Sequence, residues 1–344
     1  MGSILQRLNI SAVKKGTTWG TEVNVNVAGA GIRPQNPGAP QAKVLMLQDE
    51  VKGAWEQYLK AGPYEATDFN LDFQYHYDGN ENLLLALLFG SDTVTQQGAT
   101  SAYQHALAPI PDVSGLFFTY ATEKGSKIHV VPSAKVTKAT FSVDGGLLKL
   151  SLGCRGSHLI DNSAIITSLS AVTETGNLKE KAAFFKGKCR INAQSGSALQ
   201  DSDAVTLKNI SIEFDRKMDS ELAIGGTYIL EPKENDKPQV KVTLEFPRMD
   251  TTNAAYLQDW TAGNEKKMDL TFQGSLIAST YYYTTTLYFP RLVIEDVEYA
   301  DSKIIPAKVV LRGLVADTAP TGMTGMTAPI YCNIINTVQT SYLT

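Results

Sequence analysis

Alternating apolar and polar positions recur along the chain and predict mostly β-structure. In FNLDFQY (residues 69–75), Phe69, Leu71 and Phe73 alternate with polar neighbours. VKVTLEF, at residues 240–246, repeats the pattern. Period-two alternation is typical of a strand that places one face on a core and the other toward solvent or a partner. Tyr, Thr, Val, Ser, Asn and Gly fill most segments, which also favours a sheet protein with many turns.

These two segments belong to a longer internal repeat. The first strand pattern lies 173 positions before the second, and the same shift places Asn80 on Asn253 and Gly90 on Gly263. Each strand pattern is followed by a short helix pattern, near residues 80–89 and 253–262. We expect the Asn to cap the start of each helix and the Gly to end it in a left-handed conformation.

A second part of the repeat has a shorter shift. Pro132 and Pro290 are 158 positions apart, and, after a one-residue deletion, the alternating strand at Leu148–Cys154 has its counterpart at Ile305–Leu311. The change from 173 to 158 predicts 15 extra residues between the helix and the closing strands of the first copy. We place them in residues 90–111, whose Gly, Ser, Thr, Gln and Pro content predicts a loop.

The repeat predicts two tandem β domains. The first is expected over residues 1–165 and the second over 184–316, with a junction at 166–183. Residues 317–344 have no repeat partner, and their first half is rich in Pro and Gly, so they are expected to form a C-terminal arm. A duplicated unit indicates assembly more than a catalytic pocket.

Composition and charge exclude several classes of protein. The 344-residue chain is 43% hydrophobic and carries a formal net charge of −4, which argues against binding driven by phosphate neutralisation. Its three cysteines are odd in number and lack CxxC spacing, so neither a disulfide framework nor a zinc site is expected. The N-terminus lacks the apolar core of a secretory signal, and the longest apolar run, Leu83–Phe89, is too short for a membrane anchor.

Candidate chemistry is sparse. The four histidines have no metal-ligand spacing, and we interpret them as surface or hydrogen-bonded side chains; they are His76, His105, His129 and His158. No GxSxG elbow or Walker-type loop occurs. We therefore expect no catalytic, cofactor or metal site.

Clustered carboxylates and one aromatic run leave alternatives open. Glu295 and Glu298 lie in a strand pattern and are expected to be solvated, and Glu231 and Glu234 lie in a turn composition and are expected in a solvated loop. A carboxylate pair in an all-β enzyme would need one member buried in a cleft. The run Tyr281–Tyr283 favours an interface, with stacking on a carbohydrate as the alternative.

The order of these patterns resembles the major tail tube proteins of long-tailed bacteriophages, in particular a tandem type with two tail-tube folds in one polypeptide. The resemblance is carried by the helix NENLLLALLFG and its variable loop, the stretch YQHALAPIPDVSGLFFTYAT and the strand pair KVTKATFSVDGGLLKLSLGCRG. Its C-terminal counterpart is TLYFPRLVIEDVEYA followed by IIPAKVVLRGLVA. It covers most of residues 16–316 and rests on order and duplication, not on one motif.

The resemblance implies a β-barrel or sandwich with one packed helix in each copy, joined laterally into rings that stack as a hollow tube. Two copies per chain imply three chains in a pseudo-sixfold ring. It also implies a structural, non-enzymatic component of the virion tail, assembled in the host cytoplasm, with terminator and baseplate or tip proteins as further partners. Genomic DNA would pass through without specific binding, in keeping with the mild negative charge.

Two groups of residues are expected to carry this function. The strands around Asp72 and Thr243 are predicted to present a polar face to the lumen. Residues 49–64, with Trp55, Tyr58 and Tyr64, are predicted to form a loop that reaches a neighbouring subunit or ring. The alternative from another class is a double β-sandwich that binds carbohydrate, similar to an adhesin.

Overall fold

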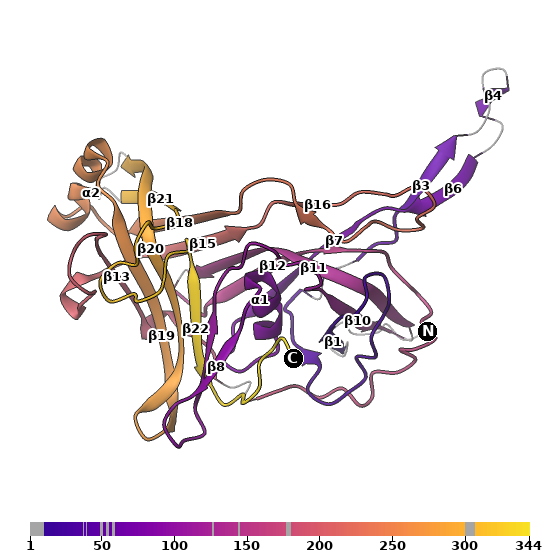
Figure 1. Ribbon diagram of the computed structural model, residues 1–344, viewed down its shortest axis with the longest axis horizontal. Helices are drawn as coiled ribbons and strands as arrows, with labels where there is room; N and C mark the ends of the chain where they lie inside the picture. Colours follow the sequence, from indigo (N-terminus) through magenta and orange to yellow (C-terminus); the bar gives the residue numbers. More distant parts are fainter. Residues whose placement is uncertain are drawn as a thin grey trace.

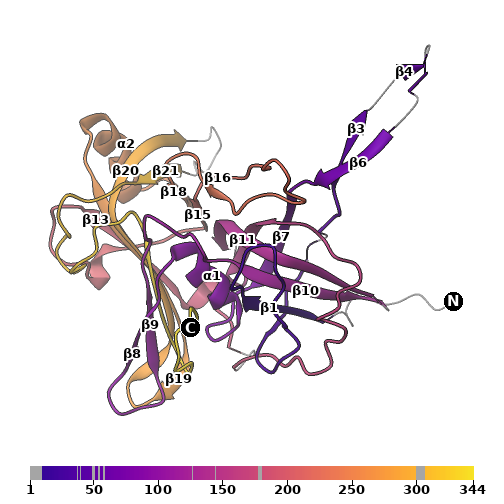
Figure 2. The ribbon, with the colours of Figure 1, turned by 45° about the vertical axis from the view of Figure 1, so that its right-hand side comes forward.

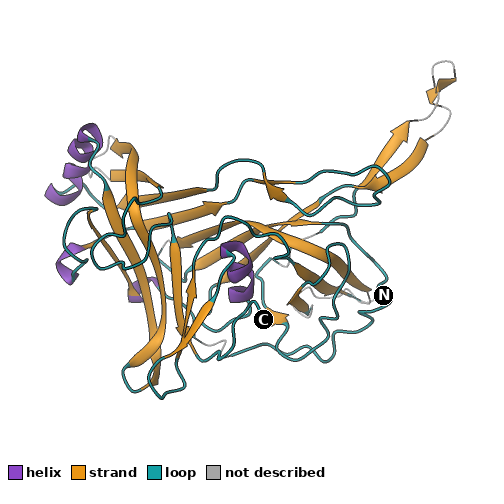
Figure 3. Cartoon of the chain, in the orientation of Figure 1, coloured by secondary structure: helices purple, strands orange, loops and turns teal. Residues whose placement is uncertain are grey.

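A single antiparallel sheet dominates the computed structural model (Figure 1). The structure describes residues 10–36, 38, 40–48, 51–52, 55–56, 59–125, 127–143, 145–176, 180–299 and 307–344. Within these residues there are two α-helices, α1 (Glu81–Phe89) and α2 (Thr251–Ala262) (Figure 3). The mainly β fold with two short helices is confirmed. The strands do not close into a barrel, and the sheet is consistent with a sandwich-type arrangement.

Five strands of the first half and five of the second follow the same order. In the first half the order is β1 (Ser11–Lys15), β10 (Phe118–Lys124), β11 (Lys127–Val143), β12 (Lys149–Gly156) and β7 (Thr67–Gln74). In the second half it is β13 (Gly187–Ala193), β19 (Lys266–Ala278), β20 (Tyr281–Tyr299), β21 (Ala307–Gly313) and β18 (Gln239–Phe246). In sequence, α1 follows β7 and α2 follows β18.

The register of the two strand sets also agrees. Leu71 of β7 pairs with Leu152, and Leu244 of β18 pairs with Val309. Strand β11 has a bulge between Val136 and Lys138 opposite β12, and β20 has one between Ile294 and Asp296 opposite β21. These are the positions that the sequence repeat superimposes, so the pattern of alternation specified the register.

Strand pairing joins the two halves into a continuous sheet. Strand β15 (Asn209–Asp215) pairs with the end of β11 on one side and with β18 on the other. The two halves therefore share a sheet and one hydrophobic core cluster, and their origin as two tandem folds stays a prediction. Residues 161–176 form no named strand and run against the first half, where Ile166 and Leu169 are buried.

Each half also carries a hairpin outside the main sheet. In the first half, β3 (Val44–Gln48) pairs with β6 (Leu59–Tyr64), and β4 (Val51–Lys52) pairs with β5 (Trp55–Glu56). This hairpin projects away from the body in both views (Figures 1 and 2). In the second half, β16 (Met218–Asp219) pairs with β17 (Lys233–Glu234), and this hairpin stays close to the first half (Figure 1).

Residues 90–111, predicted as a loop, instead contain a hairpin. Strand β8 (Thr93–Gln96) pairs with β9 (Tyr103–Leu107), and β9 pairs with the C-terminal strand β22 (Tyr331–Asn336). Strand β22 pairs in turn with Thr284–Tyr288 of β20. Much of the expected C-terminal arm is therefore packed into the sheet between the two halves, with Ile330, Cys332 and Ile334 buried.

The difference of 15 residues between the halves is a net figure. Tyr120 of β10 pairs with Val131, and Met268 of β19 pairs with Phe289. By register these pairs are equivalent, yet Tyr120 and Met268 are only 148 positions apart. The first half thus has 25 more residues before β10 (173 less 148), and the β19–β20 hairpin has ten more (158 less 148).

The helices pack on the apolar side of the sheet. Their C-terminal ends were predicted correctly, and their N-terminal caps were not. Gly90 ends α1 with φ 96° and donates its N–H to Ala86 O, and Gly263 is also left-handed after α2. The prediction that an Asn caps the start of each helix is wrong. Asn80 has helical backbone angles and no capping hydrogen bond, whereas Asn253 lies inside α2 and exchanges two hydrogen bonds with Asp250.

The remaining short elements lie at the edges. They are β2 (Gly31–Ile32), beside β1, β14 (Ala204–Val205), beside β13, and two 3-10 helices at Phe184–Lys186 and Asp201–Asp203.

Candidate assembly surfaces

The residues predicted to face a lumen lie on one face of the shared sheet. Asp72 of β7 and Thr243 of β18 are partly buried, and each alternates with core residues along its strand. Asp72 accepts a hydrogen bond of 2.5 Å from Ser151 Oγ. The two strands are separated by β12, β11 and β15, so β15 brings both positions into a single surface.

This surface is a continuous polar face. We define it by the side chains that alternate opposite the core on β7, β12, β11, β15, β18, β21 and the end of β20. One row of successive cross-strand neighbours illustrates its chemistry: Asp72, Ser151, Thr140, Glu213, Lys241 and Arg312. The core lies behind this face, so its polar side chains meet solvent or a partner.

Carboxylates accompany most cations of the polar face. The ion pairs are Arg155–Asp68 at 2.9 Å, Lys138–Glu213 at 2.9 Å, Lys308–Glu298 at 2.9 Å and Arg312–Glu295 at 3.4 Å. Hydrogen bonding to Asp68 raises the pKa of Arg155, and hydrogen bonding to Lys308 lowers the pKa of Glu298. Glu295 and Glu298 are therefore solvent-exposed strand charges, as predicted. The face offers no unbroken basic track of the kind that holds phosphates.

The projecting hairpin contains the residues predicted to reach a neighbour. Tyr64 ends β6 with 37% of its surface exposed, and its ring lies 5.3 Å from that of His158. Its N–H donates to Thr227 O at 2.8 Å, which ties the base of this hairpin to the second-half hairpin. Trp55 lies in β5, and its side chain, like Tyr58 as a whole, lies outside the described residues. The predicted excursion is thus a hairpin, and its contacts with other chains stay a prediction.

The second-half hairpin, residues 216–238, lies against the first half. Ile229 is 3% exposed, and its carbonyl accepts a hydrogen bond of 2.8 Å from Trp19 Nε1. Tyr228 stacks on His158 with 4.9 Å between ring centroids. This hairpin shows how such an element packs on a neighbouring fold, whereas the projecting hairpin contacts the body through Tyr64 at its base.

Two buried cations anchor that hairpin. Lys135 pairs with Glu231, and Arg216 pairs with Glu234 and donates to the α1 carbonyls of Leu88 and Phe89 at 2.6 and 2.8 Å. Burial lowers the pKa of both cations, and the carboxylate partners oppose that shift. The prediction that Glu231 and Glu234 are simply solvated was wrong, because each neutralises a buried charge.

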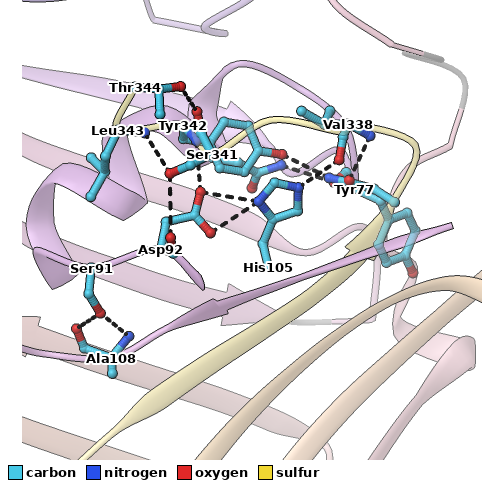
Figure 4. Close-up of polar contacts among 12 residues, drawn as sticks. Tyr77, Ser91, Asp92, His105, Ala108, Val338, Ser341, Tyr342, Leu343 and Thr344 are labelled. Carbon is cyan, nitrogen blue, oxygen red and sulfur yellow. Dashed lines mark hydrogen bonds and ion pairs between the residues drawn. The ribbon is translucent and has the colours of Figure 1, made fainter. Parts of the chain in front are cut away.

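The C-terminal residues form hydrogen bonds with the β8–β9 hairpin and with Asp92 directly before it (Figure 4). His105 and Asp92 are buried, with His105 Nδ1 3.1 Å from Asp92 Oδ1. His105 Nε2 lies 2.9 Å from Val338 O, and Tyr342 N–H donates to Asp92 Oδ2 at 2.7 Å. No sequence motif indicated this cluster, because Val338 and Tyr342 lie more than 200 positions after His105 and Asp92.

The other candidates for chemistry do not assemble into a site. Tyr282 is 39% exposed, whereas Tyr283 is buried beside Tyr77, so the tyrosine run does not form one flat platform. Among the described residues, no group of three His, Cys, Asp or Glu side chains could hold a metal ion. The three cysteines are free and buried. No helix in the described part of the chain is long and apolar enough to cross a membrane.

Sequence reasoning missed two free edges of the sheet. Residues 35–36, 38 and 40–43 lie beside β7, where Gln35 N–H donates to Asp72 O at 2.6 Å and Thr67 Oγ1 donates to Gln41 O at 3.0 Å. At the other end, Asp296–Tyr299 of β20 pairs with β21 on one flank, and no described strand pairs with the opposite flank. The Pro and Gly content of residues 35–43 concealed the first edge.

A comparison with protein-family models agrees with this architecture. Residues 66–332 match the model described as "Phage tail tube protein". The match covers more than half of the chain and includes every strand of the two sets except β1, together with both helices and β15. The chain therefore belongs to the phage tail tube protein family, whose members are structural components of the virion tail that assemble into a tube. No curated protein matches the chain.

Proposed function

We propose that this protein polymerises as stacked rings of three chains into the hollow tail tube through which phage DNA passes into the host. Each chain contributes two tail-tube folds, so that six folds with pseudo-sixfold symmetry make one ring. The proposal adds stoichiometry, ring stacking and DNA passage to the family membership.

The observation that carries the proposal is the shared register of the two halves. Five strands, a helix and a bulge recur at equivalent positions, and the pairs Leu71–Leu152 and Leu244–Val309 match residue for residue. Chance alternation would reproduce the period of the strands but not the bulge. Duplication of one ancestral fold therefore accounts best for the two halves.

The free edges support a closed ring. Two of the sheet edges, residues 40–43 and the end of β20, differ from each other, so contacts between chains that join them would be head-to-tail. A head-to-tail contact closes into a ring when its rotation divides a full turn. Closure would also remove exposed strand edges, which promote aggregation in a free sheet.

The polar face is assigned to the lumen. Its cations are largely paired with carboxylates, which supports passage of DNA without the counterion-release affinity of a basic bore. The projecting hairpin, which carries Trp55, Tyr58 and Tyr64, is assigned to contact with a neighbouring subunit or ring. Terminator and baseplate or tip proteins are the expected partners at the two ends of the tube.

Electron microscopy of the purified, concentrated protein tests the proposal. We expect rings or tubes with three chains per ring by native mass spectrometry, and a cross-section that shows six similar lobes. Six chains per ring would refute the duplicated stoichiometry, and dispersed monomers that bind glycans would refute the tube.

A further inference from the structure

The joint between the two halves is a strand pairing within one chain. Lys138–Val143 of β11 pairs with β15, and Lys138 lies opposite Asp215. Strand β15 belongs to the second half, because it continues through Arg216 into the second-half hairpin and pairs with β18. The chain therefore contains one complete example of a first fold joined to a following fold.

The end of β20 corresponds to the segment of β11 that pairs with β15 in that joint. Its residues Asp296–Tyr299 occupy the places of Lys138–Phe141, given the shared register with β21 and β12. Strand β19 pairs with β20 only as far as Leu292, as β10 pairs with β11 only as far as Ala134. The flank that β15 covers on β11 is left uncovered on β20 among the described residues.

Residues 35–43 repeat the other side of the joint. Gln41 lies against Thr67, and the corresponding pair in the second half is Phe214 and Val240. A Cβ on Gly38 would lie 2.9 Å from Asn70 O, which places Gly38 beside β7 where Ser211 lies beside Thr243 on β18. The described residues of this segment, 35–36, 38 and 40–43, thus lie along β7 as β15 lies along β18.

We infer that the free flank of β20 binds residues 40–43 of a second copy of this chain, with Asp296 opposite Ala42 and Val297 opposite Gln41 of that copy. The inference rests on the proposed ring and specifies its interface. The register is copied from Lys138–Asp215 and Ala139–Phe214 of the internal joint. Pro40 in this segment cannot donate to a ladder, which limits unwanted pairing before assembly.

A side-chain contact accompanies the backbone pairing. In the internal joint, Arg216 donates to the last carbonyls of α1, a position that favours cations. Lys43 lies 173 positions before Arg216 and is exposed. It is the last residue of the segment 40–43 and corresponds to Arg216, which comes directly after β15. Helix α2 has no basic residue in its last turn. In the joint between chains, Lys43 donates to the last carbonyls of α2.

Disulfide trapping tests the register. The double variant Asp296→Cys/Ala42→Cys places two thiols directly opposite one another across the joint, within reach of a disulfide. The matched control, Val297→Cys/Ala42→Cys, is displaced by one residue and places the thiols on opposite faces. The native cysteines are buried and contribute little background.

After mild oxidation of assembled protein, we expect covalent dimers and trimers of the first variant at least tenfold above the control on non-reducing gels. Equal trapping of both variants, or of neither in protein that forms rings, overturns the register while leaving the ring proposal intact. Trapped oligomers without tubes would support the joint and refute the tube. Wild-type protein that never associates would refute both.

The contact of Lys43 is tested separately. Lys43→Glu is expected to reduce the fraction of protein in rings by at least fivefold, with an unchanged melting temperature of the monomer. Lys14→Glu, the same change at an exposed residue of β1, is expected to assemble normally. Normal assembly of Lys43→Glu overturns the contact with α2.

Discussion

Buried cations at the interface between the halves are the residues that sequence reasoning interpreted least well. Arg216 is 1% exposed, and its partners are carbonyls of α1 and the carboxylate of Glu234. An isolated buried guanidinium would cost several kcal/mol, so these partners determine whether the hairpin packs at all. EPKEND has the composition of a solvated turn, and nothing in it shows that Lys135, 96 positions away from Glu231, needs a counter-ion.

Arg216→Met is therefore expected to destabilise the monomer. The change removes hydrogen bonds to two α1 carbonyls and leaves Glu234 without its partner, which we expect to cost about 2–4 kcal/mol. Arg155→Met is the control, because its pairs with Asp68 and Asp219 are partly exposed and should contribute about 1 kcal/mol or less. Urea denaturation of both variants checks the difference, and equal losses would contradict this account of Arg216.

His158 is expected to make the stability of the hairpin contact depend on pH. It lies between the rings of Tyr64 and Tyr228, and burial lowers its pKa. Below the unfolded pKa of about 6.5, the unfolded chain binds a proton that the folded chain resists, so stability is lost as the pH falls.

The melting temperature of the wild type should therefore fall between pH 7 and pH 5 by more than that of His158→Phe. The Phe variant keeps an aromatic ring in the stack but cannot titrate. Parallel melting curves for the two proteins over this range would show that the histidine is not responsible.

At the scale of elements, the projecting hairpin has the clearest expected role in assembly. It extends from the body in Figures 1 and 2, and Val44 and Met46 on it are exposed. Few of its described contacts support the monomer. Exposed apolar side chains on such an element are typical of a surface that a partner covers.

Deletion of residues 52–61 should consequently leave a folded monomer that cannot polymerise. Circular dichroism and thermal melting test the fold, and electron microscopy tests the assembly. Deletion of residues 98–101 at the turn of the β8–β9 hairpin provides a control of similar kind, which should retain polymerisation. Normal tubes from the first deletion would refute the assigned role of the hairpin.

Local sequence patterns predicted the elements whose structure is specified by their own residues. Alternation placed β7, β12, β18 and β21, and the glycines placed the helix ends. The β8–β9 hairpin and β22 were missed because their stability comes from pairing between segments distant in sequence, and a polar hairpin without such a partner has the composition of a loop. The shared sheet was missed for the same reason, because nothing in β15 specifies that it pairs with β11.

At the scale of the whole molecule, covalent linkage of two folds simplifies the proposed ring. Half of the joints between folds are formed within chains, so only three must form between chains. Formation of the internal joint does not depend on protein concentration, and its effective concentration is set by the linker. Ring closure then requires three components in place of six.

The charge of the polar face should control how the tube interacts with DNA. The double variant Asp72→Lys/Thr243→Lys adds two lysines to this face in each chain and so favours phosphate binding. We expect tubes that retain DNA at 50 mM salt and release it at 200 mM, whereas wild-type tubes retain none. Lys14→Glu tubes serve as a charge-changed control. Retention of DNA by wild-type tubes, or a strongly basic bore in a reconstruction, would contradict the assignment.

The insertion of β22 between β20 and β9 bears on how the protein folds during its synthesis. His105 and Val338, which meet in the finished sheet, are 233 positions apart, so β9 leaves the ribosome long before its partner. At about 5–20 residues per second, the β8–β9 hairpin waits roughly 12–47 s for β22. Because β22 is the last strand to be synthesised, the sheet is completed only after both folds have been translated.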